Sequence, residues 1–165
     1  MKRKTHDILG LAIGLWVSKV FPITNSFLAN FLSVIAMSVF INRVIDGFGG
    51  HRGFRRTPYT HSLFGLLLIS IAAILLLYCF AYLLGFGTFI HLLQNMFAVL
   101  FSIGFAHLLA DLMTADGVYL FWPFTKKRVS ATRRRYDDVL LNGLAIFFSL
   151  MIILLYLYVE LRPWL

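Results

Sequence analysis

Long apolar runs separated by short polar segments make up most of the chain. A bilayer core about 30 Å thick is crossed by about 20 residues of apolar helix. Four runs have this length and are predicted to be membrane-spanning helices: Ser26–Ile45, Ser62–Leu84, Met96–Met113 and Val139–Val159. A fifth run, Ile8–Phe21, is shorter and contains Lys19. It can span only if it extends from His6 to Ile23 and the Lys19 side chain reaches the interface.

This pattern predicts an all-α, polytopic transmembrane bundle that forms a single membrane domain over residues 1–165. Five spans are the first interpretation, and four spans with one interfacial helix are the alternative. The composition agrees, because 60% of the residues are hydrophobic and 13% are charged, whereas soluble domains have about 45–50% apolar and about 25% charged residues. The composition excludes a soluble globule and a disordered chain, and the single cysteine excludes a disulfide scaffold.

The net charge of +8 is distributed unevenly along this pattern. If the N-terminus lies inside, all but two of the 15 lysines and arginines face the inner side, and only Lys19 and Arg162 face outward. Because cytoplasmic loops carry the excess of Lys and Arg, we predict a multi-pass protein of the cell membrane with the N-terminus in and the C-terminus out. Two inner loops follow from this orientation, residues 46–61 and 114–138.

The run Arg133-Arg134-Arg135 lies in the second inner loop, directly before a predicted span. This position favours anionic lipid head groups over nucleic acid. Trp122, beside Pro123, suits an interfacial anchor. The predicted partners are therefore membrane lipids with anionic head groups and no specific nucleic acid, and a homo-oligomer is compatible with the sequence.

Histidine and aspartate residues collect at the predicted inner ends of the spans. His107 and Asp111 are four residues apart and share one helix face, which also contains Gly104, where another element can approach closely. An aspartate in hydrocarbon costs about 2.5–3.5 kcal/mol on insertion scales, so it needs a partner. A divalent metal is such a partner, with zinc as the first candidate and manganese and iron as alternatives. The candidate metal ligands are His6, Asp46, His51, His61, His107 and Asp111.

Each of these residues also has a purely structural interpretation. His107 and Asp111 can form a hydrogen-bonded pair, His61 can cap a helix, and His51 can be solvated in its loop. Their concentration at one membrane face favours the metal site. His91, at the outer side without an acidic neighbour, is assigned to interfacial packing.

Two sequence blocks resemble the YdjM-like family of membrane-bound proteins, which are described as metal-dependent hydrolases. One block is His51-Arg52-Gly53-Phe54 followed by Thr60-His61-Ser62, with residues 55–59 inserted between them. The other block extends from Ser102 to Pro123 and matches the family's spacing at eight positions: His107, Asp111, Thr114, Gly117, Val118, Leu120, Trp122 and Pro123. Thr5-His6 is similar to the family's N-terminal histidine, and the insertion, together with Asn42-Arg43 and Ile45-Asp46, resembles an archaeal branch.

The resemblance implies a helical membrane hydrolase distantly related to zinc phospholipases C. It assigns metal-ligand roles to His6, Asp46, His61, His107 and Asp111. The acidic pair that precedes the family's first loop is the single Asp46 in this chain. A site with one or two metals is therefore expected in place of a trinuclear one.

The residues and the resemblance together predict a metal-dependent hydrolase that cleaves a phosphoester of a lipid or lipid-linked substrate at the cytoplasmic face. A bound metal lowers the pKa of its water toward about 7, and Asp46 or Asp116 is the candidate general base. Four arginines are expected to bind the substrate phosphate: Arg43, Arg52, Arg55 and Arg56. The alternative is a non-catalytic membrane scaffold or partner-binding protein with a structural metal site. A metal or proton carrier is disfavoured because the outer halves of the spans contain almost no polar path.

Overall fold

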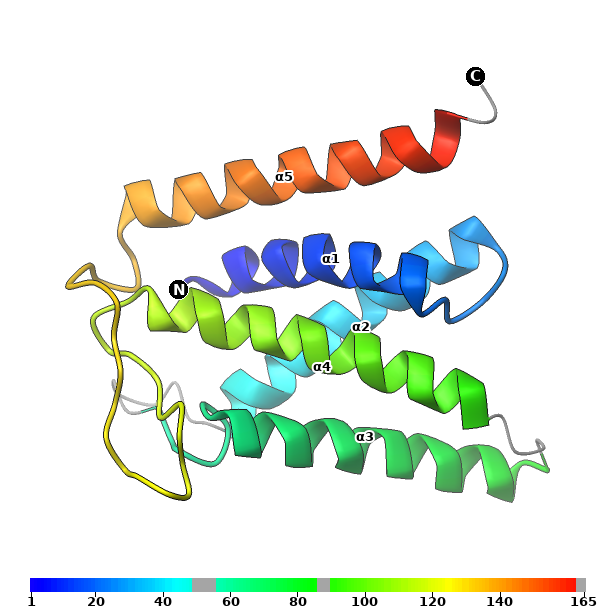
Figure 1. Cartoon of the computed structure of the whole chain (residues 1–165), viewed down its shortest axis with the longest axis horizontal. Helices are drawn as coiled ribbons and strands as arrows, with labels where there is room; N and C mark the ends of the chain where they lie inside the picture. Colours follow the sequence, from blue (N-terminus) through cyan, green and yellow to red (C-terminus); the bar gives the residue numbers. More distant parts are fainter. Residues whose placement is uncertain (49–55, 86–89, 163–165) are drawn as a thin grey trace.

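The computed structural model describes residues 1–48, 56–85 and 90–162. Within these ranges there is no β-strand, only an isolated β-bridge between Val118 and Val129. The all-α prediction is thereby confirmed for the part of the chain that the structure describes. The helices are α1 (Arg3–Val20), α2 (Phe27–Phe48), α3 (Leu63–Leu83), α4 (Ile90–Leu112) and α5 (Val139–Leu161). In Figure 1, α5, α1, α4 and α3 lie side by side and α2 crosses behind them.

Four of these helices, α2 to α5, are long and apolar enough to cross a membrane. The remaining helix, α1, has 18 residues and contains Arg3, Lys4, Asp7 and Lys19. At 1.5 Å per residue its length is about 27 Å. The structure thus agrees with a multi-pass membrane protein, while the fifth span stays a prediction.

Helix α1 lies inside the bundle, between α4 and α5, with α2 crossing behind it (Figure 1). Gly10 and Gly14 permit this close packing: a Cβ at Gly10 would lie 2.7 Å from Ser38 Oγ, and one at Gly14 would lie 2.8 Å from Val34 Cγ1. Because α1 faces other helices more than lipid, it needs fewer apolar residues than α3 or α5. Its fully buried positions are Thr5, His6, Gly10, Ala12, Gly14, Leu15 and Ser18.

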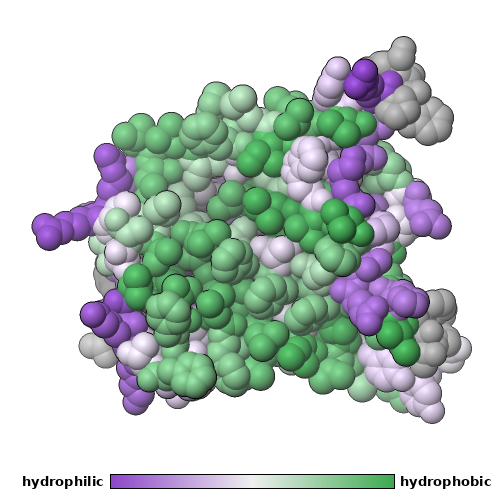
Figure 2. Space-filling model, viewed as in Figure 1, coloured by the Kyte–Doolittle hydropathy of each residue, from purple (hydrophilic) through white to green (hydrophobic). Residues whose placement is uncertain are grey.

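Large apolar side chains cover the middle of the outer surface. Leu76 on α3 is 72% exposed and Leu154 on α5 is 65% exposed. Figure 2 shows hydrophobic residues across the middle of the bundle and hydrophilic residues at its two ends. This distribution is expected of a bundle surrounded by lipid acyl chains.

Two predicted boundaries were wrong. Helix α4 begins at Ile90, six residues before the predicted Met96, and α1 begins at Arg3 in place of Ile8. The added first turns are polar, and their polar groups find partners at the ends of the bundle: for example, the Asn95 side-chain amide donates a hydrogen bond to the Pro22 carbonyl at 2.8 Å. Helical turns at a membrane interface therefore do not need an apolar sequence.

The segment between α4 and α5 folds over one end of the bundle. Val118 and Val129 exchange two backbone hydrogen bonds, of 2.9 and 2.8 Å, and the Tyr119 N–H donates to the His61 carbonyl at 2.8 Å. Gly117 permits this turn, because its φ is +61° and a Cβ there would lie 2.4 Å from the Val129 carbonyl oxygen. In Figure 1 this segment lies at the same end as the N-terminus and the start of α3.

Candidate metal centre

Five of the six predicted metal ligands meet at that end of the bundle. They come from four parts of the chain, because α1 contributes one, α2 contributes one, the residues before α3 contribute one, and α4 contributes two. Each residue is at most 2% exposed. The five are His6, Asp46, His61, His107 and Asp111. The sixth predicted ligand, His51, lies outside the described residues.

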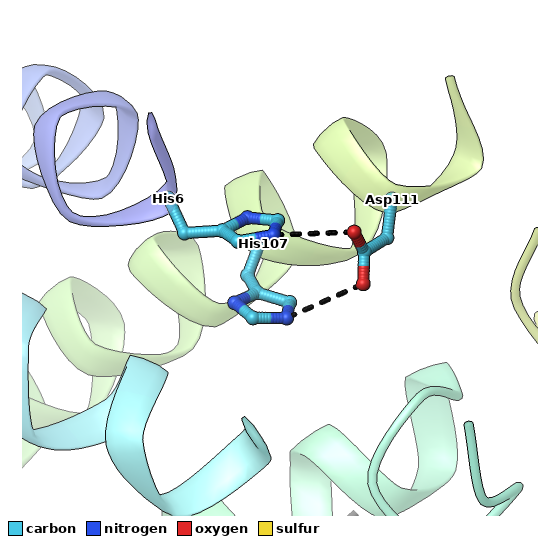
Figure 3. A group of neighbouring side chains, drawn as sticks. All are labelled: His6, His107 and Asp111. Carbon is cyan, nitrogen blue, oxygen red and sulfur yellow. Dashed lines mark ion pairs between the residues drawn. The ribbon is translucent and has the colours of Figure 1, made fainter. Parts of the chain in front are cut away.

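Asp111 is at the centre of this cluster. Its Oδ1 lies 3.1 Å from His6 Nε2, and its Oδ2 lies 3.5 Å from Nε2 of both His61 and His107. Figure 3 shows the contacts of Asp111 with His6 and His107, whose rings stack with centroids 3.8 Å apart. The i,i+4 spacing on α4 aims His107 and Asp111 at the same point, as predicted from the sequence.

Asp46 completes the cluster from α2, with its Oδ1 3.5 Å from His107 Nε2. Two overlapping groups result, His6–His107–Asp111 and Asp46–His61–His107, and the ligand atoms within each lie within 4.8 Å of one another. Since His107 belongs to both groups, the five side chains form one continuous polar centre. Such a centre offers ligands for one metal or for two neighbouring metals.

The contacts fit a divalent metal better than a set of hydrogen bonds. Within the described chain, Nε2 of His6, His61 and His107 and Oδ2 of Asp111 are buried and make no hydrogen bond, although buried polar atoms are normally hydrogen-bonded. The contacts between histidine Nε2 atoms and carboxylate oxygens in the cluster are 3.1 to 3.5 Å long, and imidazole and carboxylate groups are ordinary ligands of zinc. A metal would therefore coordinate buried atoms that otherwise lack a hydrogen bond.

The orientation of His107 is set by Asn42. The Asn42 side-chain Nδ2 donates to Asp7 Oδ1 at 3.1 Å, which assigns its Oδ1 as the acceptor of the 3.0 Å contact with His107 Nδ1. His107 Nδ1 must then carry the proton, and its Nε2 lone pair points at Asp111 and Asp46. Metal-binding histidines typically have such a partner on the second ring nitrogen.

His61 has an equivalent partner next to it in sequence. Its Nδ1 lies 2.8 Å from Thr60 Oγ1, which in turn lies 3.2 Å from Thr57 Oγ1. Burial lowers the pKa of His61 below its ordinary value of 6.5, mainly because desolvation disfavours the charged imidazolium. His61 is therefore held as the neutral imidazole, the form that binds a metal.

Arg56 is next to Asp111. One guanidinium nitrogen, Nη2, donates to Asp111 Oδ1 at 2.7 Å. The other, Nη1, donates to the carbonyls of Asp111 and Gly117 and to Thr114 Oγ1, at distances of 2.7 to 3.2 Å. Arg56 thus caps the carboxyl end of α4 and orients Asp111 at the same time. The amino group of Met1 also contacts Asp111 Oδ1, at 2.5 Å.

Two other predicted site residues, Arg43 and Asp116, are described by the structure and do not join the cluster. Arg43 is exposed on α2, and Asp116 is half-buried after α4 and belongs to neither ligand group. Arg52 and Arg55 lie outside the described residues. The roles of these four residues as phosphate ligands or general base stay predictions.

Two contributors to the centre were not identified from the sequence. Asn42 lies one helical turn before Asp46, a spacing that places both side chains on the inward face of α2 and could have indicated its role. Asn142, at the start of α5, accepts hydrogen bonds from the Lys2 backbone N–H and from Thr5 Oγ1, at 3.0 and 2.8 Å. It thereby ties α5 to the turn of α1 that contains His6.

Comparison with known proteins gives one family. The model of the YdjM inner membrane protein family matches residues 1–164. No curated protein and no solved structure matches the chain.

Proposed function

The chain belongs to the YdjM inner membrane protein family, and from that premise we propose that its metal centre lies at the cytoplasmic face of the membrane. In this arrangement α1 to α5 all span, with the N-terminus in and the C-terminus out. Two observations support the proposal: α1 is about 27 Å long and packs against three apolar helices, and almost all Lys and Arg residues fall on the side that contains the centre.

We propose further that the protein is a metal-dependent hydrolase that cleaves a phosphoester of a lipid or lipid-linked substrate. The observation that supports this is the buried centre of three histidines and two aspartates at one end of an otherwise apolar bundle. Polar residues at such positions are costly in a membrane, and they are retained where they have a function. In the proposed arrangement the centre lies at head-group depth, where phospholipids carry their phosphoester bonds.

The protein's own residues have separate roles in this proposal. His6, His61, His107, Asp46 and Asp111 hold the metal. A bound divalent ion, for which zinc is the first candidate and manganese and iron are alternatives, would supply Lewis acidity and an activated water at neutral pH. Asp46 or Asp116 would accept the proton of the attacking water.

The arginines provide positive charge around the centre. Exposed Arg43, together with Arg52 and Arg55, would bind the phosphate, because guanidinium groups pair with two phosphate oxygens. Arg56 is already bonded to Asp111, Thr114 and Gly117. Its first role in the proposal is therefore to orient Asp111, and a contact with the phosphate is additional.

The deep burial of all five ligands favours one other candidate, a membrane scaffold with a structural metal site. Structural metal sites have closed coordination, whereas catalytic sites keep a position open to water or substrate. The two candidates differ in lipid turnover, because both need the metal but only the hydrolase cleaves a substrate.

The test uses the full-length protein in nanodiscs, loaded with zinc and supplied with a glycerophospholipid, a phosphatidic acid or a polyprenyl phosphate. We expect release of phosphate or head group by the wild type, loss of release in His107→Ala, and normal release in the matched variant His91→Ala, which changes a histidine outside the centre. If His107→Ala loses its metal and no substrate of the panel is cleaved even by the wild type, the scaffold is correct. Equal cleavage by wild type and His107→Ala would contradict a hydrolase centred on these residues.

A further inference from the structure

The segment Tyr119–Val129 has an unusual surface for a loop, because exposed aromatic side chains are followed directly by cations. Phe124 is 94% exposed and Phe121 is 55% exposed. Three exposed cations follow, Lys126, Lys127 and Arg128. Packing does not explain Phe124, because its side chain contributes almost nothing to the interior.

This segment lies against the lipid-facing side of α3. The Trp122 ring is 5.7 Å from the ring of Phe64, which is in the first turn of α3 and is 39% exposed. The Leu63 N–H donates to the Leu120 carbonyl at 3.4 Å. In Figure 1 the yellow segment bends beside the start of α3, at the end of the bundle. Since α3 is a candidate span, Phe124 lies near the boundary between acyl chains and head groups.

The segment is held in place before any partner binds. The bridge between Val118 and Val129 closes its base, and the Trp122 and Thr125 N–H groups donate to the carbonyls of Tyr119 and Phe121 at 3.0 and 3.2 Å. Docking of a preorganised segment costs little conformational entropy. The exposed position of Phe124 is therefore a fixed feature of the surface.

The cations of this segment differ from the second cationic run, Arg133–Arg135. Arg134 pairs with Asp138 at 3.1 Å and Arg135 with Asp137 at 3.3 Å. Lys126, Lys127 and Arg128 form no ion pair with any carboxylate in the described ranges. The Arg128 guanidinium lies over the Tyr119 ring, 5.9 Å from its centroid, and none of the three charges is neutralised by a described carboxylate, so an anionic surface is the complementary partner.

We propose that Tyr119–Val129 is a membrane-docking surface, in which Phe124 inserts into the leaflet beside α3 and Lys126, Lys127 and Arg128 bind anionic phospholipid head groups. An exposed aromatic residue beside cations is typical of segments that bind the membrane interface. A soluble protein or an RNA would not need Phe124 at the perimeter of a span. The inference goes beyond the proposed hydrolase and does not depend on catalysis.

The depth of position 124 is tested with spin labels on the full-length protein in nanodiscs. In a Cys79→Ser background, Phe124→Cys is labelled and compared with Arg133→Cys, an exposed position in the same loop. We expect the label at position 124 to collide more with oxygen, which concentrates in lipid, and the label at position 133 to collide more with a water-soluble nickel chelate. A water-accessible label at position 124 would overturn the insertion of Phe124.

The charge is tested with two variants of equal net charge, Lys126→Gln/Lys127→Gln and Arg134→Gln/Arg135→Gln. Spin-labelled phosphatidylglycerol and phosphatidylcholine report the preference for the anionic lipid. In the lysine variant we expect the preference for phosphatidylglycerol over phosphatidylcholine to fall about fivefold or more. In the arginine variant it should fall much less. Equal losses in both variants, or no loss in the lysine variant, would overturn the proposal. Metal content, measured on the same samples, tests the metal centre independently.

Discussion

Asn42 gives the sharpest single test of how the metal centre is organised. Its side chain is 2% exposed and joins His107 Nδ1, at 3.0 Å, to Asp7 Oδ1, at 3.1 Å. The Leu side chain in Asn42→Leu has the same number and branching of heavy atoms but removes both hydrogen bonds, so His107 can then adopt the tautomer that protonates Nε2. Loss of such a partner costs about 10- to 100-fold in metal affinity, equivalent to about 1.4–2.7 kcal/mol. We expect a loss in this range for Asn42→Leu.

A charge-preserving exchange provides the control. Asn42→Asp alone places a carboxylate next to Asp7, about 3 Å away, and the repulsion should weaken the centre. Adding Asp7→Asn restores the pairing of donors with acceptors. The amide at position 7 then donates to the carboxylate at position 42, and this carboxylate still accepts from His107 Nδ1. The double variant should therefore recover most of the affinity that Asn42→Asp loses.

The assay is competition with a chelator of known zinc affinity, on metal-free protein in detergent or nanodiscs. Thermal unfolding of the metal-free variants separates a change in affinity from a change in folding. Our reasoning about the tautomer fails if Asn42→Leu binds zinc as tightly as the wild type. It also fails if the double variant is no better than Asn42→Asp.

Two further predictions concern stability. The pKa of buried His61 is lowered from 6.5, so below about pH 6.5 the unfolded chain takes up a proton that the native protein does not. The metal-free protein should therefore lose stability as the pH falls from 7.5 to 5.5. Over the same pH range the melting temperature of His61→Gln should fall less. An equal or larger fall in His61→Gln would contradict this. In Gly104→Ala the new Cβ would lie 2.1 Å from the Cδ1 of fully buried Leu66, so we expect the free energy of unfolding to fall by about 1–3 kcal/mol. Gly143→Ala, where nothing lies within 4 Å of the new Cβ, is the matched control in urea or thermal unfolding, and equal losses would refute the packing argument.

The helices were predictable to the extent that the bilayer determines them. A membrane requires long apolar segments, so α2, α3 and α5 were predicted to within a few residues. The start of α4 could not be predicted from hydropathy, because His91 and Asn95 in its first turns are polar. The folded segment after α4 depends on contacts across the chain, such as the one between Tyr119 and the His61 carbonyl, and these leave no periodic pattern.

The ligand set of the site was more predictable than the orientation of its neighbours. His107 and Asp111 follow from their spacing, and His6, Asp46 and His61 follow from their position at the same end of the predicted spans. Arg56 was predicted from its charge to bind a substrate phosphate. Its direction is set by the carboxyl end of α4, whose carbonyls and carboxylate it contacts, and no local pattern in the sequence contains that information. Asn42 depends in the same way on how α2 packs against α1 and α4.

The central claim is that these five side chains form a metal centre, and metal content measured by elemental analysis tests it most directly. The full-length wild type, His107→Ala, Asp111→Ala and the control His91→Ala are purified in parallel without chelators and normalised to protein concentration. We predict a stoichiometric divalent metal in the wild type and in His91→Ala, and its loss in His107→Ala and Asp111→Ala, each in folded protein with retained helical content. An unchanged metal content in both variants of the centre, or no metal in the wild type after zinc loading, would contradict the account.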